Sequence, residues 1–477
     1  MYALAPSLLA LVVLSPLIPQ ALADPILNNA YQNLLRIPAS SPSLVFQDEG
    51  VFPSIAIDTS TDTDNPNPYT PDYRDPYDTK IDSEAQNLHP LPYRNGLGST
   101  IPGPRNPTRE RQNPDIIRPP STDHGSLPNM RWSFADSHTR IEEGGWTRQT
   151  TIRELPTSKE LAGVNMRLDA GAIRELHWHR EAEWAYVFFG RVRVTGIDSE
   201  GRAFIDDLEQ GDLWYFPSGH PHALQGLGPE GTEFLLVFDD GGFSEESTFL
   251  LTDWMAHTPK SVLSSNFDLE PQTFDSIPKS EKYIFRGSPP PPIPSSRPPA
   301  FTPSPERFTH KMLSQKPEQC TGGLVRITDS TNFPISKRIA AAHLTINPGA
   351  VREMHWHPNA DEWSYFIRGR ARVTIFGAEG NARTFDYGPG DVGIVPRNMG
   401  HFIENLSEEE GEEVEVLEIF RAERFEDFSL KEWLGQMSET LVKEHLFMDD
   451  EAGGGEFLGS VRGSKKDPIR AGRGRSA

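Results

Sequence analysis

The feature that most restricts the fold of this chain is an internal duplication. The segment from Pro156 to His179 matches the segment from Pro334 to His357 at a constant offset of 178. After one inserted residue the offset becomes 179, and it holds as far as His222 and His401. A register kept over this distance indicates two copies of one domain. A chain of 477 residues is long enough to build two cores.

Each copy has the pattern of antiparallel β-structure. Short alternating runs, such as 191–194 and 371–375, are separated by Gly, Pro and Asp. Helical patterns occur only late in each copy, near 251–255 and 430–437. The pattern predicts an all-β chain with two tandem jelly-roll barrels and a few short helices.

Composition divides the chain into six parts. The first residues hold a short apolar run that ends in Ala-Leu-Ala, as a signal peptide does, so we expect secretion. Two further segments, one rich in Pro, Asp and Ser and one with nine prolines, are expected to be disordered and extended, respectively. The expected parts are a signal peptide (1–23), a mostly disordered extension (24–125), an N-terminal domain (126–285), a Pro-rich linker (286–305), a C-terminal domain (306–450) and a solvated, basic, Gly-rich tail (451–477).

The charge of the chain excludes some partners. Its formal net charge is -22, and nucleic-acid binding needs a positive surface that releases counterions from phosphate. No segment after the leader is apolar enough to span a membrane, so we expect neither nucleic acid nor membrane as partner. Cys320 is the single cysteine, which excludes an intrachain disulfide. A small anionic substrate would need a local positive pocket.

Histidines and a carboxylate recur at one spacing in both copies. Residues two apart on a strand share a face, so His177 and His179 should project into one barrel interior, where Glu183 and His222 can join them. The second copy repeats the set as His355, His357, Glu362 and His401. A lone histidine is more often structural. Six of the 14 histidines in two equal sets, each with a carboxylate, indicate two metal sites.

The ligand type narrows the choice of metal. Three imidazoles and one carboxylate suit Mn(II), Fe(II), Co(II), Ni(II) or Zn(II). No thiolate is available, which disfavours a structural zinc site. The ligand chemistry alone does not choose among these metals.

The two copies also carry recognisable motifs. Gly171-x5-His177-x-His179-x3-Glu183 and Gly211-x5-Pro217 resemble the two cupin motifs, and the second copy repeats both. The region from about 129 to 447 resembles bicupin oxalate decarboxylases. The resemblance implies an enzyme with two Mn²⁺ per chain and dioxygen as co-catalyst, which converts oxalate to formate and carbon dioxide. It also implies a homo-oligomer, a trimer or a hexamer.

Two arginines are candidates for binding the substrate. Oxalate is a small dianion, so a buried site needs a fixed cation besides the metal. Arg174 and Arg352 each stand three residues before the first histidine of a set. A guanidinium offers the planar fork that pairs with a carboxylate.

Formate production also needs a general acid. The family carries this acid on a lid with the sequence Ser-Glu-Asn-Ser, and the resemblance places Glu245 at that glutamate, within the segment 239–249. Glu246 stands where the family has Asn, and the extra charge could change lid closure or the pKa of Glu245. Glu418, in an otherwise apolar strand, matches a family glutamate beside the second metal, and we expect it to play a supporting role.

Trp178 and Trp356, between the paired histidines, should face away from the metals, either packing between the barrels or carrying electrons.

Two rival functions remain open. An oxalate oxidase would use the same ligands and release peroxide, and a storage or sugar-binding bicupin would have no activity.

Overall fold

Two antiparallel β-domains contain most of the residues that the computed structural model describes. These residues are 109, 112–113, 123–293, 295, 297, 300–407, 411–448, 453–462 and 466–472, all within the compact unit Pro66–Ala477. The expected signal peptide and nearly all of the expected N-terminal extension lie outside them. No helix in this described part is long and apolar enough to span a membrane.

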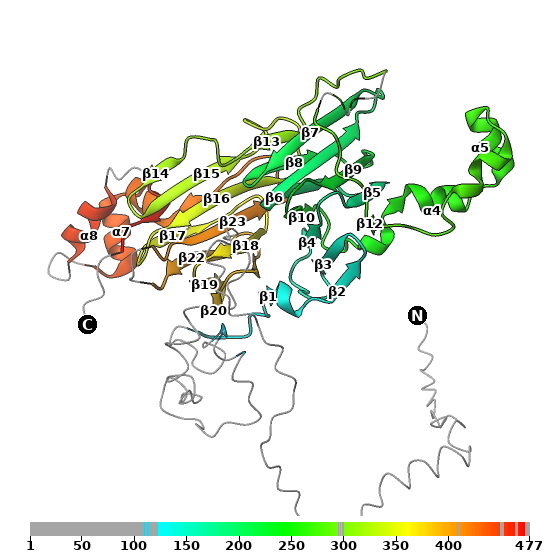
Figure 1. The fold of residues 1–477 in the computed structure, drawn as a ribbon. Coiled ribbons are helices and arrows are strands. Elements are labelled where there is room, and N and C mark those ends of the chain that lie inside the picture. The colour runs from blue at the N-terminus through cyan, green and yellow to red at the C-terminus, as the bar shows by residue number, and fades with distance from the viewer. Residues whose placement is uncertain are drawn as a thin grey trace, which may run out of the picture. The chain divides into compact units, whose positions relative to one another are not determined.

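The first barrel is organised around one long strand, β6, which runs through both of its walls (Figure 1). The first half of β6 pairs with β10 and β8, and its second half pairs with β7 and β9. Gly190 lies at the change of partner with φ +69°, where a Cβ would meet the Gly231 carbonyl oxygen at 2.0 Å, so the motif needs glycine here. The strands are β2 (Thr139–Glu142), β3 (Gly145–Thr150), β4 (Ala162–Leu168), β5 (Ile173–Trp178), β6 (Glu183–Ile197), β7 (Ala203–Glu209), β8 (Asp212–Phe216), β9 (His222–Gly226), β10 (Thr232–Phe238), β11 (Phe249–Leu250) and β12 (Ile284–Phe285).

The second barrel repeats this arrangement with two separate strands, β18 and β19, in place of β6. Its walls are a seven-stranded and a six-stranded sheet. The strands are β14 (Glu318–Cys320), β15 (Gly323–Thr328), β16 (Ala340–Ile346), β17 (Val351–Trp356), β18 (Glu362–Arg368), β19 (Ala371–Gly377), β20 (Asn381–Tyr387), β21 (Asp391–Val395), β22 (Gly400–Asn405), β23 (Val414–Phe420), β24 (Phe428–Ser429) and β25 (Ile469–Arg470).

The first strand of each copy pairs with a sheet of the other barrel. Strand β1 (Arg131–Ser133) pairs with β21, and β13 (Thr309–Lys311) pairs with β8. The registers are equivalent under the duplication, since Trp132 opposes Val392 and His310 opposes Leu213. The copies predicted to begin at 126 and 306 therefore each place their first strand in a sheet of the opposite barrel. The strands pair across because each completes an edge of the opposite sheet.

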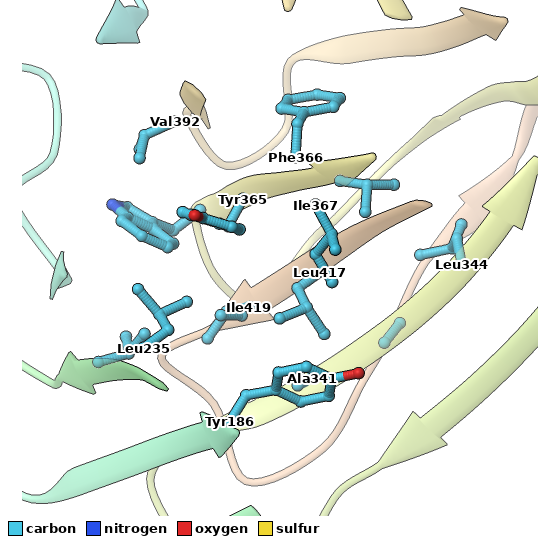
Figure 2. Packing of buried hydrophobic residues seen from close by; sticks show 14 of the residues in the cluster. Tyr186, Leu235, Ala341, Leu344, Tyr365, Phe366, Ile367, Val392, Leu417 and Ile419 are labelled. Atoms are coloured by element: carbon cyan, nitrogen blue, oxygen red, sulfur yellow. The ribbon is translucent and has the colours of Figure 1, made fainter. Parts of the chain in front are cut away.

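Apolar side chains from both barrels form one continuous core. Figure 2 shows Tyr186 and Leu235 of the first barrel beside Ala341, Leu417 and Ile419 of the second. All five are fully buried. Full burial of a large apolar side chain contributes about 1.5–3 kcal/mol, so the contact between the barrels is part of the stability of each.

Short α-helices occur late in each copy, as predicted. They are α4 (Leu251–Ala256) and α5 (Lys260–Phe267) in the first copy, and α6 (Leu430–Gln436), α7 (Glu439–Leu446) and α8 (Gly454–Val461) in the second, with 3₁₀ helices η2 (Phe134–Asp136), η3 (Glu245–Ser247) and η4 (Pro271–Ser276). The described residues of the expected linker, 286–305, form no helix.

The expected solvated tail is wrong for much of 451–477. Leu458 and Val461 of α8 are buried against Val442 of α7, and β25 pairs with β17 beside the second histidine set. Apolar residues among the glycines and basic residues supply this packing, and the basic composition concealed it.

Candidate metal centres

The first predicted ligand set comes together inside the first barrel. His177 lies on β5 and His179 just after it, Glu183 begins β6, and His222 begins β9. Their ligand atoms all lie within 4.8 Å of one another, and all four residues are buried. Glu183 Oε2 is 3.1 Å from His179 Nε2 and 3.4 Å from His222 Nε2.

Backbone carbonyls orient the three imidazoles of this centre. Each Nδ1 lies 2.6–2.8 Å from the carbonyl oxygen of a residue two positions away. A protonated Nδ1 donates to that carbonyl, which leaves Nε2 as the ligand atom. His222 Nε2 has no hydrogen-bond partner among the described residues. A buried nitrogen of this kind fits a bound cation at the centre of the cluster.

The second set repeats this geometry in the second barrel. The Nε2 atoms of His357 and His401 each lie 3.0 Å from Glu362 Oε2. His355 Nε2 has no hydrogen-bond partner within the described ranges, and its Nδ1 lies 2.6 Å from a backbone carbonyl oxygen. All eight predicted ligands therefore lie in two clusters of four.

Electrostatics favour the metal-binding forms of two ligands of the first centre, His177 and Glu183. Burial lowers the pKa of His177 well below its usual value, and Arg174 beside it adds to this effect. Burial alone would raise the pKa of Glu183, but His222 and His179 outweigh burial and hold the pKa well below its ordinary value. Neutral imidazoles and an ionised carboxylate bind divalent cations, so the residues present fit a manganese ion.

The two centres differ in the group that holds the second carboxylate oxygen. In the first, Trp214 Nε1 donates to Glu183 Oε1 over 2.6 Å. In the second, Ser364 Oγ donates to Glu362 Oε1 over 2.5 Å. Neither donor was predicted from the sequence, although Trp214 lies within the motif Gly211-x5-Pro217. Such donors orient ligands and change metal affinity.

A β-bulge turns each candidate arginine toward its metal centre. Arg174 and His177 are an odd number of residues apart, so strict alternation would place them on opposite faces. The pairing of β5 with β9 shifts register between these two residues, and the pairing of β17 with β22 shifts between Arg352 and His355. All four side chains are buried as a result.

The first arginine is held by an aromatic ring. The guanidinium of Arg174 lies 4.0 Å from the centroid of the Tyr283 ring, and its Nη1 donates to the Tyr283 carbonyl oxygen over 3.4 Å. Arg174 makes no ion pair with any carboxylate of the described residues. A buried cation with this environment can accept an anionic ligand.

The second arginine is already paired. Arg352 Nε lies 3.3 Å from Glu418 Oε1, and its Nη2 lies 2.9 Å from Asp427 Oδ2. Lys466, in the segment expected to be a free tail, pairs with Asp427. These residues line a cavity of about 50 Å³. Two carboxylates therefore already neutralise the guanidinium that oxalate would need, although its Nη1 has no hydrogen-bond partner among the described residues.

Glu418 lies beside Arg352 of the second centre and is fully buried on β23. Burial raises the pKa of its carboxyl, and the charge on Arg352 opposes that effect. This contact to Arg352 is compatible with a supporting role.

The predicted acid on the 239–249 segment, called the lid below, lies near Arg174 of the first centre. Glu245 begins η3, and Thr147 Oγ1 donates to its Oε1 over 2.7 Å. Burial raises the pKa of the Glu245 carboxyl, while neighbouring hydroxyl groups and Arg174 oppose that effect. Glu246 is exposed, so its additional charge points into solvent.

The two tryptophans face away from the metal centres, but they do not pack between the barrels. Trp178 stacks on Phe249 at 5.5 Å and contacts the edge of Trp254 on α4. Trp356 makes the equivalent edge contact with Trp433 on α6. Trp254 and Trp433 are 63% and 52% exposed, so each cluster reaches the surface.

Comparisons with known proteins agree with this geometry. A family model described as cupin matches residues 133–275 and 310–452. Oxalate decarboxylase OxdC of Bacillus subtilis is 51% identical over 81% of this chain and 98% of its own length. This chain belongs to the oxalate decarboxylase family of cupins.

Other members of the oxalate decarboxylase family match over similar lengths. A probable oxalate decarboxylase of Arthroderma benhamiae is 43% identical over 71% of this chain and 84% of its own length. A solved mutant structure of the Bacillus subtilis OxdC has a TM-score of 0.76 and 50% identity, and covers 81% of this chain and 100% of that one.

Proposed function

We propose that this protein is a manganese-dependent oxalate decarboxylase whose first metal centre converts hydrogen oxalate to formate and carbon dioxide. The observation that carries the proposal is that a buried cation and a protonatable carboxyl group occur together at this centre. Arg174 is a buried cation without a carboxylate partner among the described residues, and Glu245 is a carboxyl group with a raised pKa on the segment that faces it.

The ligand set provides the metal chemistry. Manganese bound by His177, His179, Glu183 and His222 would supply a Lewis acid and a redox centre for oxalate. A solved structure of the Bacillus subtilis relative concerns the Mn(II) centres of that enzyme, which supports manganese here. Dioxygen as co-catalyst is proposed from the family resemblance.

Arg174 binds and orients the substrate. Its guanidinium offers two parallel N–H donors to one carboxylate of oxalate. Packing on the Tyr283 ring limits the rotamers of Arg174, so little conformational entropy is lost when oxalate binds.

Glu245 moves the proton. When carbon dioxide leaves, the remaining carbon must gain a proton to become formate. Burial favours the neutral carboxylic acid, which can donate this proton. The next hydrogen oxalate returns a proton to Glu245, so each turnover converts one hydrogen oxalate into one formate and one carbon dioxide. The lid also excludes water and oxidant.

The second centre has a supporting role in this proposal. Arg352 is 1% exposed and is paired with Glu418 and Asp427. Oxalate bound there would bring further negative charge beside two buried carboxylates that already pair with the guanidinium, which is costly. The second metal then stabilises the barrel that supports the first.

We also propose a secreted homo-oligomer, a trimer or a hexamer. Secretion rests on the leader-like pattern of residues 1–23. Assembly rests on two repeat-equivalent apolar surface patches, one with Leu176 and Trp254 and one with Met354 and Trp433, which are 49–63% exposed. Contact between the first patch of one subunit and the second patch of the next would be heterologous and could close into a ring.

Incubation of manganese-loaded protein with oxalate tests the function. Formate without a matching yield of peroxide is expected, whereas peroxide as the main product would favour the oxidase. Absence of both would favour the storage or sugar-binding bicupin. His177→Ala should abolish activity through the loss of a ligand.

The double variant Glu245→Ala with Glu246→Asn tests the proton donor, since Glu246 could otherwise substitute in part. It should keep its manganese, lose formate production and release more peroxide. Formate at the parent rate would remove Glu245 from the mechanism.

A further inference from the structure

The first residue of the lid joins three parts of the molecule. Asp239 follows β10 directly and is 2% exposed. Its Oδ1 accepts a hydrogen bond from the backbone N–H of Ala182, next to the metal ligand Glu183, over 2.8 Å. Its Oδ2 lies 2.5 Å from Nε of Arg338, which belongs to the second barrel. The start of the lid is therefore attached to both barrels.

The next residues of the lid are held by the first barrel. Gly241 donates its N–H to the Lys159 carbonyl oxygen over 3.1 Å and accepts from the Ile152 N–H over 2.8 Å. A Cβ at Gly241 would meet the Ser158 carbonyl oxygen at 2.0 Å, so the contact requires glycine. The segment 239–241 is thus fixed on two sides.

The position of this stem decides where the rest of the lid lies. Phe243 stacks on Phe238 with centroids 3.6 Å apart, and it meets the His179 ring edge-on at 6.3 Å. Glu245 follows two residues later. A displacement of Asp239 would therefore move both the ring that covers a metal ligand and the proposed acid.

The equivalent loop of the first barrel makes a similar contact to the second barrel. Glu160 is the repeat equivalent of Arg338, at the offset of 178. Its carboxylate accepts from the Asp361 N–H over 3.2 Å and lies 3.5 Å from Arg397 Nη2, beside the second centre. The same loop position thus crosses to the opposite metal centre in both copies, with opposite charge. Because both copies keep this contact between the barrels although the charge of the residue is reversed, the contact is unlike a chance pair on the surface.

We infer that Arg338 is a positioning residue for the lid of the first metal centre, supplied by the other barrel. The predicted effect of Arg338 on the reaction products rests on the proposed function, whereas its predicted effect on the opening of the lid does not. The ion pair holds Asp239 so that Phe243 and Glu245 stay over the centre. Without it the lid opens more often, and oxidant competes with proton transfer.

The test compares Arg338→Gln and Arg338→Lys in the full, manganese-loaded protein. Half of the Arg338 side chain is exposed, so neither change should prevent folding. Lys337→Gln is the matched control, because Lys337 makes an exposed pair with Glu423 at 2.9 Å. Amide hydrogen exchange of residues 242–248 without oxalate reports on the lid alone. The ratio of formate to peroxide reports on the reaction.

Arg338→Gln should speed amide exchange in the lid by about tenfold, since breaking a charge-assisted contact favours local opening. It should also lower the ratio of formate to peroxide by roughly three- to tenfold. Arg338→Lys should restore most of the parent exchange rate and of the parent product ratio, and Lys337→Gln should match the parent in both. Unchanged lid exchange in Arg338→Gln would overturn the inference even if the enzyme decarboxylates oxalate. If the double variant at 245 and 246 still made formate at the parent rate, the proposed proton donor would fail, and the exchange result would still decide the role of Arg338.

Discussion

Trp214 donates its indole N–H to Glu183 over 2.6 Å and so holds the carboxylate oxygen on the side away from the histidines. Trp214 lies opposite Ala185 in the pairing of β6 and β8. In the second barrel the equivalent pair is Ser364 and Gly393, and the donor has moved to the other strand. The two centres therefore have the same ligands with different support.

Trp214→Phe should weaken metal binding at the first centre alone. The change removes the N–H donor while keeping most of the ring, so Glu183 loses its orientation without a large cavity. Loss of such a partner costs about 10–100-fold in metal affinity. Manganese content after graded chelation, together with the electron paramagnetic resonance spectrum, measures the effect at each centre.

Ser364→Ala is the matched change at the second centre and should weaken only that site. Equal loss of metal from both centres in Trp214→Phe would contradict the view that each donor orients the carboxylate of one centre only.

Arg174→Lys should lower kcat/KM by about 10–100-fold although it keeps the charge. Lysine lacks the planar fork that pairs with a carboxylate and cannot stack on Tyr283 in the same way. Steady-state formate assays over a range of oxalate concentrations measure the loss. Kinetics like those of the parent would show that Arg174 does not contact oxalate.

Arg352→Lys should affect stability more than turnover. Its guanidinium is buried between Glu418 and Asp427, and lysine cannot satisfy both carboxylates. We expect a loss of about 1–3 kcal/mol in the free energy of unfolding, measured by urea denaturation. A large rise in KM with unchanged stability would instead place oxalate at the second centre.

The raised pKa of Glu245 predicts a defined pH dependence. Formate production should fall as pH rises through this pKa, which lies above the usual value, because the ionised group cannot donate a proton. The same group binds its proton more tightly when folded, so it favours folding at low pH and costs stability as pH rises past its unfolded value. Glu245→Gln should therefore gain stability relative to the parent with rising pH. Urea denaturation over a pH series measures this difference, and a constant difference would refute it.

The exposed tryptophans should hold the proposed oligomer together. Combining Trp254→Ser with Trp433→Ser removes a large apolar side chain from each surface patch, and we expect dissociation toward monomers. Size-exclusion chromatography with light scattering measures the mass. Ile141→Ser, at an 80% exposed residue outside both patches, is the control. A double variant with the parent mass would show that the patches are not the interface.

The two ligand sets could be predicted from the sequence because the chemistry is local and repeated. His177 and His179 share a face of one strand, and a copy at a fixed offset made chance occurrence implausible. The barrels were predictable for a similar reason, since alternation along a strand is a local property. The lid acid was identified only through the family resemblance.

The orientation of Arg174 was decided by the tertiary structure. A β-bulge before His177 reverses the alternation that the sequence predicts, and no local pattern marks that bulge. The exchange of β1 and β13 between the barrels was equally hidden, because an edge strand pairs with whichever sheet presents an open edge.

The contacts that distinguish the two centres join residues far apart in the chain. Arg174 meets Tyr283, Arg352 meets Asp427, and Asp239 meets Arg338. The sequence by itself determined which side chains could bind metal, because strand periodicity and the repeat set their spacing. Only the tertiary structure decided which arginine has no carboxylate partner, because the folding of each barrel brings those distant segments together. It also decided what holds the lid, because that contact depends on how the two barrels pack against each other.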